Sequence, residues 1–478
     1  MFKLYSTFDR KLENFSPEED KHVKIYSCGP TVYSRQTIGN FRTFVFSDLL
    51  RRSLEYMGYR VDLVMNITDV GHLTMTDEEK AKHKDLEITD TDAGLDRLEK
   101  AAKKENTTVW DIADRYTKQF FGDVARLNIL PARVYPKATD HIPEQIEMIQ
   151  KLIDGGYAYV TQSAVYFDTD KFKGYADIAG QSLDQKSVAV RSEVEKDPSK
   201  HNPADFRLWQ LDQPDHSMQW DSPWGKGFPG WHIECSAMSM KYLGQPIDIH
   251  TGGADHITVH HPNEIAQSEA ATGKKFVNYW MHGAFLVVDG KRMGKSLGNA
   301  YTIEDIESKG YDGSDLRYFY LTAHYRQILN FTWDSLEAAH NRLAKIRQGI
   351  DLLERSKPKA GKVLSKFKQQ FSAALENDLN LPMALAVFNE VFEAGIDASD
   401  KLTTLKNFDE VLGLKLFTVK HEDQGEIREI ESLIKQREDF RSGKQWEKAD
   451  DIRKILLSKY HVTVEDSSGG TIWKRTGE

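Results

Sequence analysis

HVKIYS (His22–Ser27) is the stretch that decides the fold, because it has the composition of a short buried strand and is broken at once by Cys28-Gly29-Pro30. After a short loop, Phe41–Tyr56 carries apolar residues at helical spacing and is stopped by Gly58. YRVDLVMNIT (Tyr59–Thr68) then has the composition of a second strand. A strand, a helix and a strand at these spacings predict a parallel βαβ unit, the opening of a doubly wound α/β sheet.

The sheet pattern resumes late in the chain. PIDIH (Pro246–His250) predicts another strand, and it is followed by a glycine-containing loop and a helix from about His260. The charged, mixed region from about Thr89 to Gly225 is interpreted as insertions over the nucleotide fold, with helical stretches at Asp111–Leu127 and Pro143–Asp154. From Ser314 onward the pattern is almost wholly helical.

Length and composition restrict the class of protein. The 478 residues predict about three domains at ~150 residues each, and 40% hydrophobic residues exclude global disorder. With 64 Lys and Arg against 73 Asp and Glu, the formal charge is −9, so a nucleic-acid partner would need a local basic patch. Only Cys28 and Cys235 are cysteines, and Met1–Lys11 lacks the apolar core of a signal peptide. We therefore expect a soluble cytoplasmic protein.

One basic stretch stands out from the acidic average. Arg342–Lys368 holds nine Lys and Arg against two Asp and Glu. Taken alone, such a run is more often a solvated helix face than a nucleic-acid contact.

Two loops have the composition of phosphate-binding sites. Thr37-Ile38-Gly39-Asn40 lies between the first strand and its helix, where glycine admits a ligand and the helix start offers amides. Arg292-Met293-Gly294-Lys295-Ser296 lies in a Gly- and Lys-rich loop suited to charge on a transferring phosphoryl group. Each alone could be an ordinary turn or a solvated loop, whereas the two in this order are much more specific.

A third group offers metal ligands. Cys28 ends the first strand, Cys235 follows Gly230-Trp231-His232-Ile233-Glu234, and His260 and Glu264 are one helical turn apart. Two thiolates, an imidazole and a carboxylate form a chemically sensible zinc set. For two distant cysteines, however, buried free thiols are the commoner outcome. Spacing alone does not select the four ligands, because there are nearby rivals at His232, Glu234, His256 and His261.

Taken together, these motifs resemble cysteinyl-tRNA synthetase, a class I aminoacyl-tRNA synthetase. The resemblance covers nearly the whole chain in the order of that family. It rests on CGPTVY (28–33), TIGN (37–40), NITD (66–69), PGWHIECSAM (229–238), HHPNEIAQS (260–268), RMGKSLGN (292–299), DLRYF (315–319), NDLNLP (377–382) and GTIWKR (470–475).

The resemblance implies a Rossmann-type catalytic core with insertions, followed by an all-α helical C-terminal region. It implies activation of L-cysteine with ATP and Mg²⁺, then transfer to the 3′ end of tRNA(Cys), by a monomer with one Zn²⁺ per chain. Five segments are expected. They are the first half of the core (1–88), an insertion (89–225), the second half of the core (226–313), a helical tRNA-stem bundle (314–420) and an anticodon-binding tail (421–478).

The resemblance also assigns residues. Its zinc ligands match Cys28, Cys235, His260 and Glu264, which picks the first histidine of the pair rather than His261. Its amino-acid pocket matches Gly29, Thr31, Thr68 and Trp231, and its ATP-contacting lysine in the mobile loop matches Lys295. We accordingly expect catalytic roles for Thr37, Gly39, Asn40 and Lys295, and ATP binding by Arg292 and Lys295. Zinc prefers thiolate to hydroxyl, so cysteine would bind as an extra ligand where serine would not.

The chain departs from the family in two motifs. The first loop of the family usually begins with His, where this chain has Thr37, and the mobile loop usually reads Lys-Met-Ser-Lys-Ser, where this chain has Arg292 and Gly294. Thr37 shortens a donor to the ATP phosphates, although tryptophanyl enzymes of the same class commonly use TIGN.

Two alternatives are weighed. A mycothiol-type cysteine ligase shares the activation chemistry but uses an amino-sugar acceptor and lacks a long anticodon-binding region. A non-catalytic RNA-binding paralogue is supported by Thr37 alone, and retention of all four ligands and Lys295 counts against it.

Overall fold

The computed structural model describes residues 2–71, 96–178, 198–294, 297–356, 358–417, 424–460, 462–467 and 470–475. The chain divides into two compact units, Met1–Lys415 and Leu416–Glu478. In the described part, no helix is long and apolar enough to cross a membrane.

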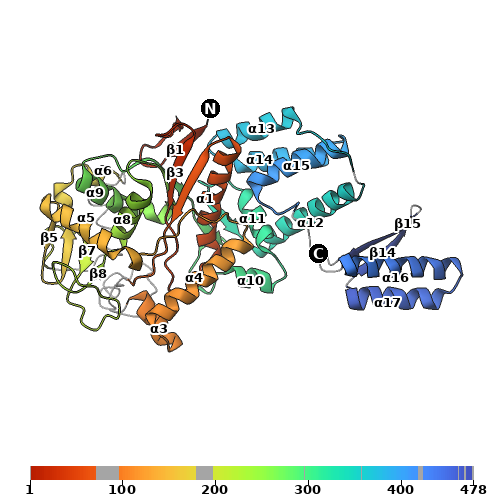
Figure 1. Cartoon of the computed structure of the whole chain (residues 1–478), viewed down its shortest axis with the longest axis horizontal. Helices are drawn as coiled ribbons and strands as arrows, with labels where there is room; N and C mark the ends of the chain where they lie inside the picture. Colours follow the sequence, from red (N-terminus) through yellow and green to blue (C-terminus); the bar gives the residue numbers. More distant parts are fainter. Residues whose placement is uncertain are drawn as a thin grey trace. The chain divides into compact units, whose positions relative to one another are not determined.

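A parallel four-stranded sheet forms the centre of the first unit (Figure 1). Its order is β10 (Val277–Gly283), β9 (Ile247–Gly253), β3 (His22–Ser27) and β4 (Arg60–Met65), and every neighbouring pair is parallel. The strands predicted from HVKIYS, YRVDLVMNIT and PIDIH are confirmed. The carboxyl ends of β3, β4 and β9 meet at one edge of the sheet, which is where open α/β sheets place their ligands.

Helix α1 (Ile38–Tyr56) connects β3 to β4, as predicted. It is buried along most of its length and is held by two buried arginines. Arg317 donates to Oδ2 of Asp48, in the middle of α1, at 2.5 Å, and also to the carbonyl oxygens of Leu127 and Leu412. Arg42 of α1 donates to the carbonyl oxygens of Ala284, Phe285, His324 and Gln327. These contacts fix the position of the helix that begins at the TIGN loop.

The described residues between β4 and β9 combine helices with a small antiparallel sheet. The two predicted helical stretches are confirmed as α4 (Val109–Arg126) and α5 (Ile142–Asp154). The sheet, which the sequence pattern did not predict, has the order β5-β6-β7-β8. The further elements before β9 are α3 (Arg97–Glu105), β5 (Ala158–Val160), β6 (Ala164–Phe167), α6 (Tyr175–Ile178), β7 (Phe206–Gln210), β8 (Phe228–Pro229) and α8 (Trp231–Leu243). Helix α9 (His260–Thr272) follows β9.

The helices between Gly313 and Leu412 pack into a bundle within the first unit (Figure 1). Short strands accompany them: β13 (Leu329–Phe331) pairs with β11 (Leu286–Val288), which also pairs with β12 (Lys291–Arg292). An N-terminal hairpin, β1 (Lys3–Ser6) and β2 (Lys11–Asn14), is attached by Asp378, whose Oδ1 accepts from the backbone N–H of Tyr5 at 2.9 Å. The helices of the bundle are α11 (Gly313–Leu321), α12 (Trp333–Arg355), α13 (Ser365–Glu376), α14 (Leu381–Glu393) and α15 (Ala398–Leu412), and α10 (Ile303–Ser308) precedes them.

The second unit has a core of its own. It consists of α16 (Gln424–Ser442), α17 (Trp446–Tyr460) and an antiparallel hairpin of β14 (Val462–Ser467) and β15 (Gly470–Arg475). The hairpin interrupts the helical pattern predicted for this part of the chain. The core residues are Ile430, Ile434, Ile452, Leu456, Tyr460, Val462 and Val464.

Candidate active site

The structure brings Cys28, Cys235, His260 and Glu264 together at the carboxyl edge of the sheet. One possible ligand atom from each lies within 4.8 Å of all the others, and all four residues are buried. The two Sγ atoms are 4.0 Å apart, and Nε2 of His260 is 3.1 Å from Oε1 of Glu264. These four residues are the zinc ligands that the family resemblance implies.

Local structure explains how residues so distant in sequence meet. Cys28 follows β3, and its backbone N–H donates to the carbonyl oxygen of Thr251 in the adjacent strand β9. Cys235 lies one turn into α8, and His260 and Glu264 lie on one face of the first turns of α9. Because α8 and α9 pack side by side, their first turns present these three side chains to Cys28.

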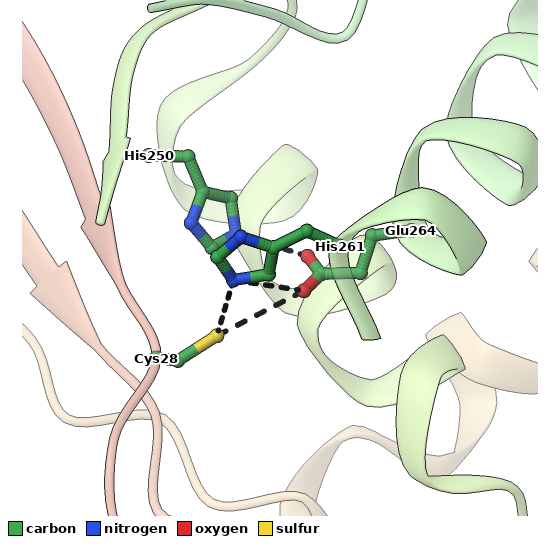
Figure 2. Close-up of side chains that lie close together, drawn as sticks. All are labelled: Cys28, His250, His261 and Glu264. Carbon is green, nitrogen blue, oxygen red and sulfur yellow. Dashed lines mark hydrogen bonds and ion pairs between the residues drawn. The ribbon is translucent and has the colours of Figure 1, made fainter. Parts of the chain in front are cut away.

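A second set overlaps the first. Cys28, His250, His261 and Glu264 also meet the 4.8 Å criterion, and Figure 2 shows the two imidazoles facing the thiol and the carboxylate. Nε2 of His261 is 3.3 Å from Sγ of Cys28, and Nε2 of His250 is 3.0 Å from Oε2 of Glu264. His261 was a rival from the sequence, whereas His250 was missed. Its position at the end of the strand predicted from PIDIH was the available signal, and in the structure it lies opposite Tyr26 of β3.

The buried groups of this site differ in the direction in which their surroundings shift their pKa values. Burial opposes ionisation of Glu264, but His250 and His260 outweigh it and hold the pKa of the carboxyl at about 2. Burial likewise opposes protonation of His260, yet Glu264 and Cys235 raise its pKa to about 10. Burial and the Cys235 sulfur raise the pKa of the Cys28 thiol.

Burial also works against a thiolate at Cys235, but the hydrogen bond with Cys28, assisted by His260, lowers the pKa of this thiol. By contrast, burial and the neighbouring imidazoles lower the pKa of His261 well below its usual value. The site therefore brings together sulfur, carboxylate-oxygen and imidazole-nitrogen donors, which is ligand chemistry for a borderline-soft cation such as zinc.

The residues assigned to the amino-acid pocket lie beside the four candidate ligands. The backbone N–H of Gly29 donates to Oδ1 of Asn66 at 2.8 Å, and a Cβ at this position would lie 1.7 Å from the carbonyl oxygen of Asn66, so only glycine fits. Thr31 and Thr68, in the loops that follow β3 and β4, form a parallel β-bridge. The ring of Trp231, at the start of α8, lies 4.3 Å from the ring of His260 between centroids.

Thr37 caps α1. Its Oγ1 accepts from the backbone N–H of Asn40 at 3.3 Å and donates to Oδ1 of Asn40 at 2.8 Å, while its own backbone N–H donates to the same oxygen. This capping box gives Thr37 a structural task that the sequence analysis, which considered only phosphates, did not foresee.

The two phosphate-type loops meet although they are far apart in sequence. A Cβ at Gly39 would lie 3.3 Å from Sδ of Met293, so the second loop packs closely on the start of α1. Arg292 is exposed at the end of β12, and Lys295 lies outside the described residues.

Residues that the sequence analysis did not single out hold these loops. Asn299 accepts from the backbone N–H of Gly294 and donates to the carbonyl oxygen of Arg292. The backbone N–H of Ile38 donates to the carbonyl oxygen of Tyr301, and the hydroxyl of buried Tyr320 donates to the carbonyl oxygen of Ile38 at 2.6 Å.

The matching family model and the similar curated proteins indicate the same family. Residues 14–341 match the model of the tRNA synthetases class I (C) catalytic domain. The chain is 41% identical to a cysteine–tRNA ligase from Treponema denticola, with 99% of each chain covered. It is 43% identical to cysteine–tRNA ligase 1 from Burkholderia lata, covering 98% of this chain and 95% of that relative.

Solved structures show the same fold at low identity. A Mycobacterium tuberculosis methionyl-tRNA synthetase in complex with methionyl-adenylate has a TM-score of 0.54 at 14% identity, covering 86% of this chain and 93% of that chain. A LeuRS–tRNA–LeuAMS complex from Agrobacterium radiobacter has a TM-score of 0.55 at 12% identity, covering 84% of both chains.

Proposed function

The chain belongs to the cysteine–tRNA ligases of class I, and from that premise we propose how its residues divide the work of the reaction. The enzyme activates L-cysteine with ATP to cysteinyl-adenylate and transfers the cysteinyl group to the 3′ end of tRNA(Cys). The first step requires no protein base, because the substrate carboxylate itself attacks the α-phosphorus and pyrophosphate leaves. Catalysis is then a matter of positioning and of stabilising charge.

ATP, with Mg²⁺, binds at the start of α1. Thr37 and Asn40 fix the first turn through their capping box, and Gly39, which has no side chain, lets Met293 of the second loop approach that turn closely. Arg292 and Lys295 bring positive charge to the phosphates from the second loop, as the family motif implies. The contact between Met293 and Gly39 supports this division, because it places the second loop over the first.

Cysteine binds among Gly29, Thr31, Thr68 and Trp231, at the carboxyl edge of the sheet. Its thiol faces Cys28, Cys235, His260 and Glu264, which hold one zinc ion. Two bonds of about 2.3 Å at a tetrahedral angle span about 3.8 Å, and the two Sγ atoms are 4.0 Å apart, so the donor set fits zinc. When bound, zinc supplies a Lewis-acidic centre that prefers a thiolate to a hydroxyl group.

The first set fits zinc better than the second because it offers two sulfur donors rather than one. In this proposal, His250 supports the site from outside by its contact with Glu264. The imidazole of His261, whose Nδ1 lies 2.8 Å from Nε2 of His282, belongs to the wall of the site.

The proposal extends to domains and partners. Residues 1–88 and 226–313 form the catalytic core around the insertion 89–225, the bundle 314–420 binds the tRNA stem, and 421–478 binds the anticodon. The enzyme is a monomer in the cytoplasm. The mycothiol-type ligase and the non-catalytic paralogue are not favoured, because cysteine–tRNA ligases match this chain along nearly its full length.

The observation that carries the proposal is the meeting of four metal-type donors at the carboxyl edge of the sheet, in a chain whose two phosphate-type loops also meet each other. It is tested by cysteine-dependent ATP–pyrophosphate exchange, with serine as the matched substrate, followed by charging of tRNA(Cys). Exchange with cysteine but not serine is expected, and then charging. Absence of exchange would overturn the proposal. Exchange without charging of tRNA(Cys) would instead favour the alternative function, a cysteine ligase with an amino-sugar acceptor.

A further inference from the structure

The buried carboxylate of Glu234 lies beside the proposed amino-acid pocket but belongs to neither ligand set. It is fully buried in the first turn of α8, immediately before Cys235. A buried carboxylate is unfavourable unless it is compensated by charge or hydrogen bonds. Its Oε2 accepts a hydrogen bond of 2.9 Å from Oγ1 of Thr68.

This contact ends a directional chain of hydrogen bonds across the pocket. The backbone N–H of Gly29 donates to Oδ1 of Asn66 at 2.8 Å, and Nδ2 of Asn66 donates to Oγ1 of Thr68 at 3.0 Å. Thr68 then donates to Glu234, so every proton in the chain points toward the carboxylate. Such chains polarise their members, and an ionised acceptor strengthens the last bond.

The direction of these hydrogen bonds decides which group of a ligand Thr68 can recognise. A hydroxyl group has one proton and two acceptor lone pairs. Its proton goes to Glu234 and one lone pair accepts from Asn66, so its remaining capacity is that of an acceptor. Of the two charged groups of an amino acid, the ammonium group donates and the carboxylate only accepts.

The burial of Thr68 and the negative charge of Glu234 also favour a positively charged group at this place. Thr68 is 2% exposed, so a group bound there is largely removed from water, and the carboxylate of Glu234 favours a cation. The carboxylate of Asp69, the next residue, adds to this acidic environment. Burial raises its pKa, and the charge of Glu234 contributes to the increase. A substrate carboxylate is disfavoured at the same place.

We propose that Glu234 is a positioning residue that holds the hydroxyl group of Thr68 as an acceptor for the α-ammonium group of the amino-acid substrate. Bound in this way, the substrate keeps its carboxylate away from Glu234 and available to ATP. The inference rests on the proposed function and adds the group that selects the amino end of the substrate.

The test compares three probes in the zinc-loaded full-length enzyme. L-cysteine has a thiol, an ammonium group and a carboxylate, 3-mercaptopropionate lacks the ammonium group, and cysteamine lacks the carboxylate. Their affinities are measured by calorimetry for the parent, for Glu234→Gln, which removes the charge in a similar shape, and for Thr68→Val, which removes the hydroxyl group. Asp62→Asn, at the far end of β4, is the matched control.

Both pocket variants should weaken cysteine and cysteamine by about 10- to 100-fold, the range for a hydrogen bond to a charged group, and leave 3-mercaptopropionate unchanged. Thr68→Ser should restore the parent pattern, and the KM for ATP should not move. Equal loss for all three probes would overturn the proposal, because Glu234 would then be merely structural. No loss for any probe would also overturn it. If the parent enzyme shows no cysteine-dependent exchange, the proposed function itself has failed.

Discussion

At the scale of single residues, the two overlapping ligand sets make opposite demands on Cys235 and His261. Cys235→Ser should remove most of the zinc and with it cysteine binding, because one of two thiolates is lost, whereas His261→Asn should retain about one zinc per chain. Metal analysis after dialysis against a weak chelator measures both. Zinc retained in Cys235→Ser but lost in His261→Asn would move the site to the set drawn in Figure 2.

Thr37 has two tasks in our proposal, and a pair of substitutions separates them. Thr37→Ala removes the cap and should lower the free energy of unfolding by about 0.5–2 kcal/mol while slowing exchange. Thr37→Asp keeps a good cap but adds negative charge. Stability should therefore hold, while the KM for ATP rises. Exchange by Thr37→Asp at the parent rate would show that this position does not face the phosphates.

Elements were easier to predict than the contacts between them. The strand at His22–Ser27 and helix α1 followed from composition and spacing, which are local properties. The choice of the four candidate ligands needed the family resemblance, because His260 and His261 are equivalent in a linear pattern. The role of His250 in the site depends on which strands are neighbours in the sheet, and the cap at Thr37 depends on the orientation of its hydroxyl group. Both are determined by tertiary packing, which a linear pattern does not contain.

Helix α1 is held to the bundle by the buried ion pair of Asp48 and Arg317. The contribution of this pair to the free energy of unfolding can be measured. Arg317→Met leaves the Asp48 carboxylate with one fewer partner in a buried site, so it should lower the free energy of unfolding by about 3–5 kcal/mol. Arg355→Met, in an exposed pair with Asp351, is the control and should change little. Chemical denaturation followed by circular dichroism compares them. Equal stability of the two variants would contradict the assignment of Arg317 as a structural joint.

At the scale of the whole molecule, the boundary between Lys415 and Leu416 separates two units with their own cores. A chain ending at Lys415 should keep cysteine-dependent exchange, because every assigned site residue precedes the boundary. Charging of tRNA(Cys) should be greatly weakened. Loss of exchange together with charging would show that the first unit depends on the second.

The basic stretch Arg342–Lys368 is less available to RNA than its composition suggests. Arg342 pairs with Glu393 and Arg347 with Asp312, whereas Lys359, Lys362 and Lys366 are exposed, and Lys357 lies outside the described residues. Replacing Lys359, Lys362 and Lys366 with Gln should weaken tRNA binding and flatten its dependence on salt, because fewer counterions are released. Unchanged affinity would assign the stretch to an ordinary solvated face. Filter binding at several salt concentrations measures the difference.

The guanidinium group of Arg42 binds four main-chain carbonyl oxygens, those of residues 284, 285, 324 and 327. A carbonyl oxygen is present whatever side chain its residue carries, so this attachment constrains one position of the gene and leaves its partners open to mutational drift. In a saturation library selected for growth, codon 42 should accept almost nothing but arginine, since lysine lacks the planar fork. The exposed partners Phe285 and Gln327 should accept many replacements.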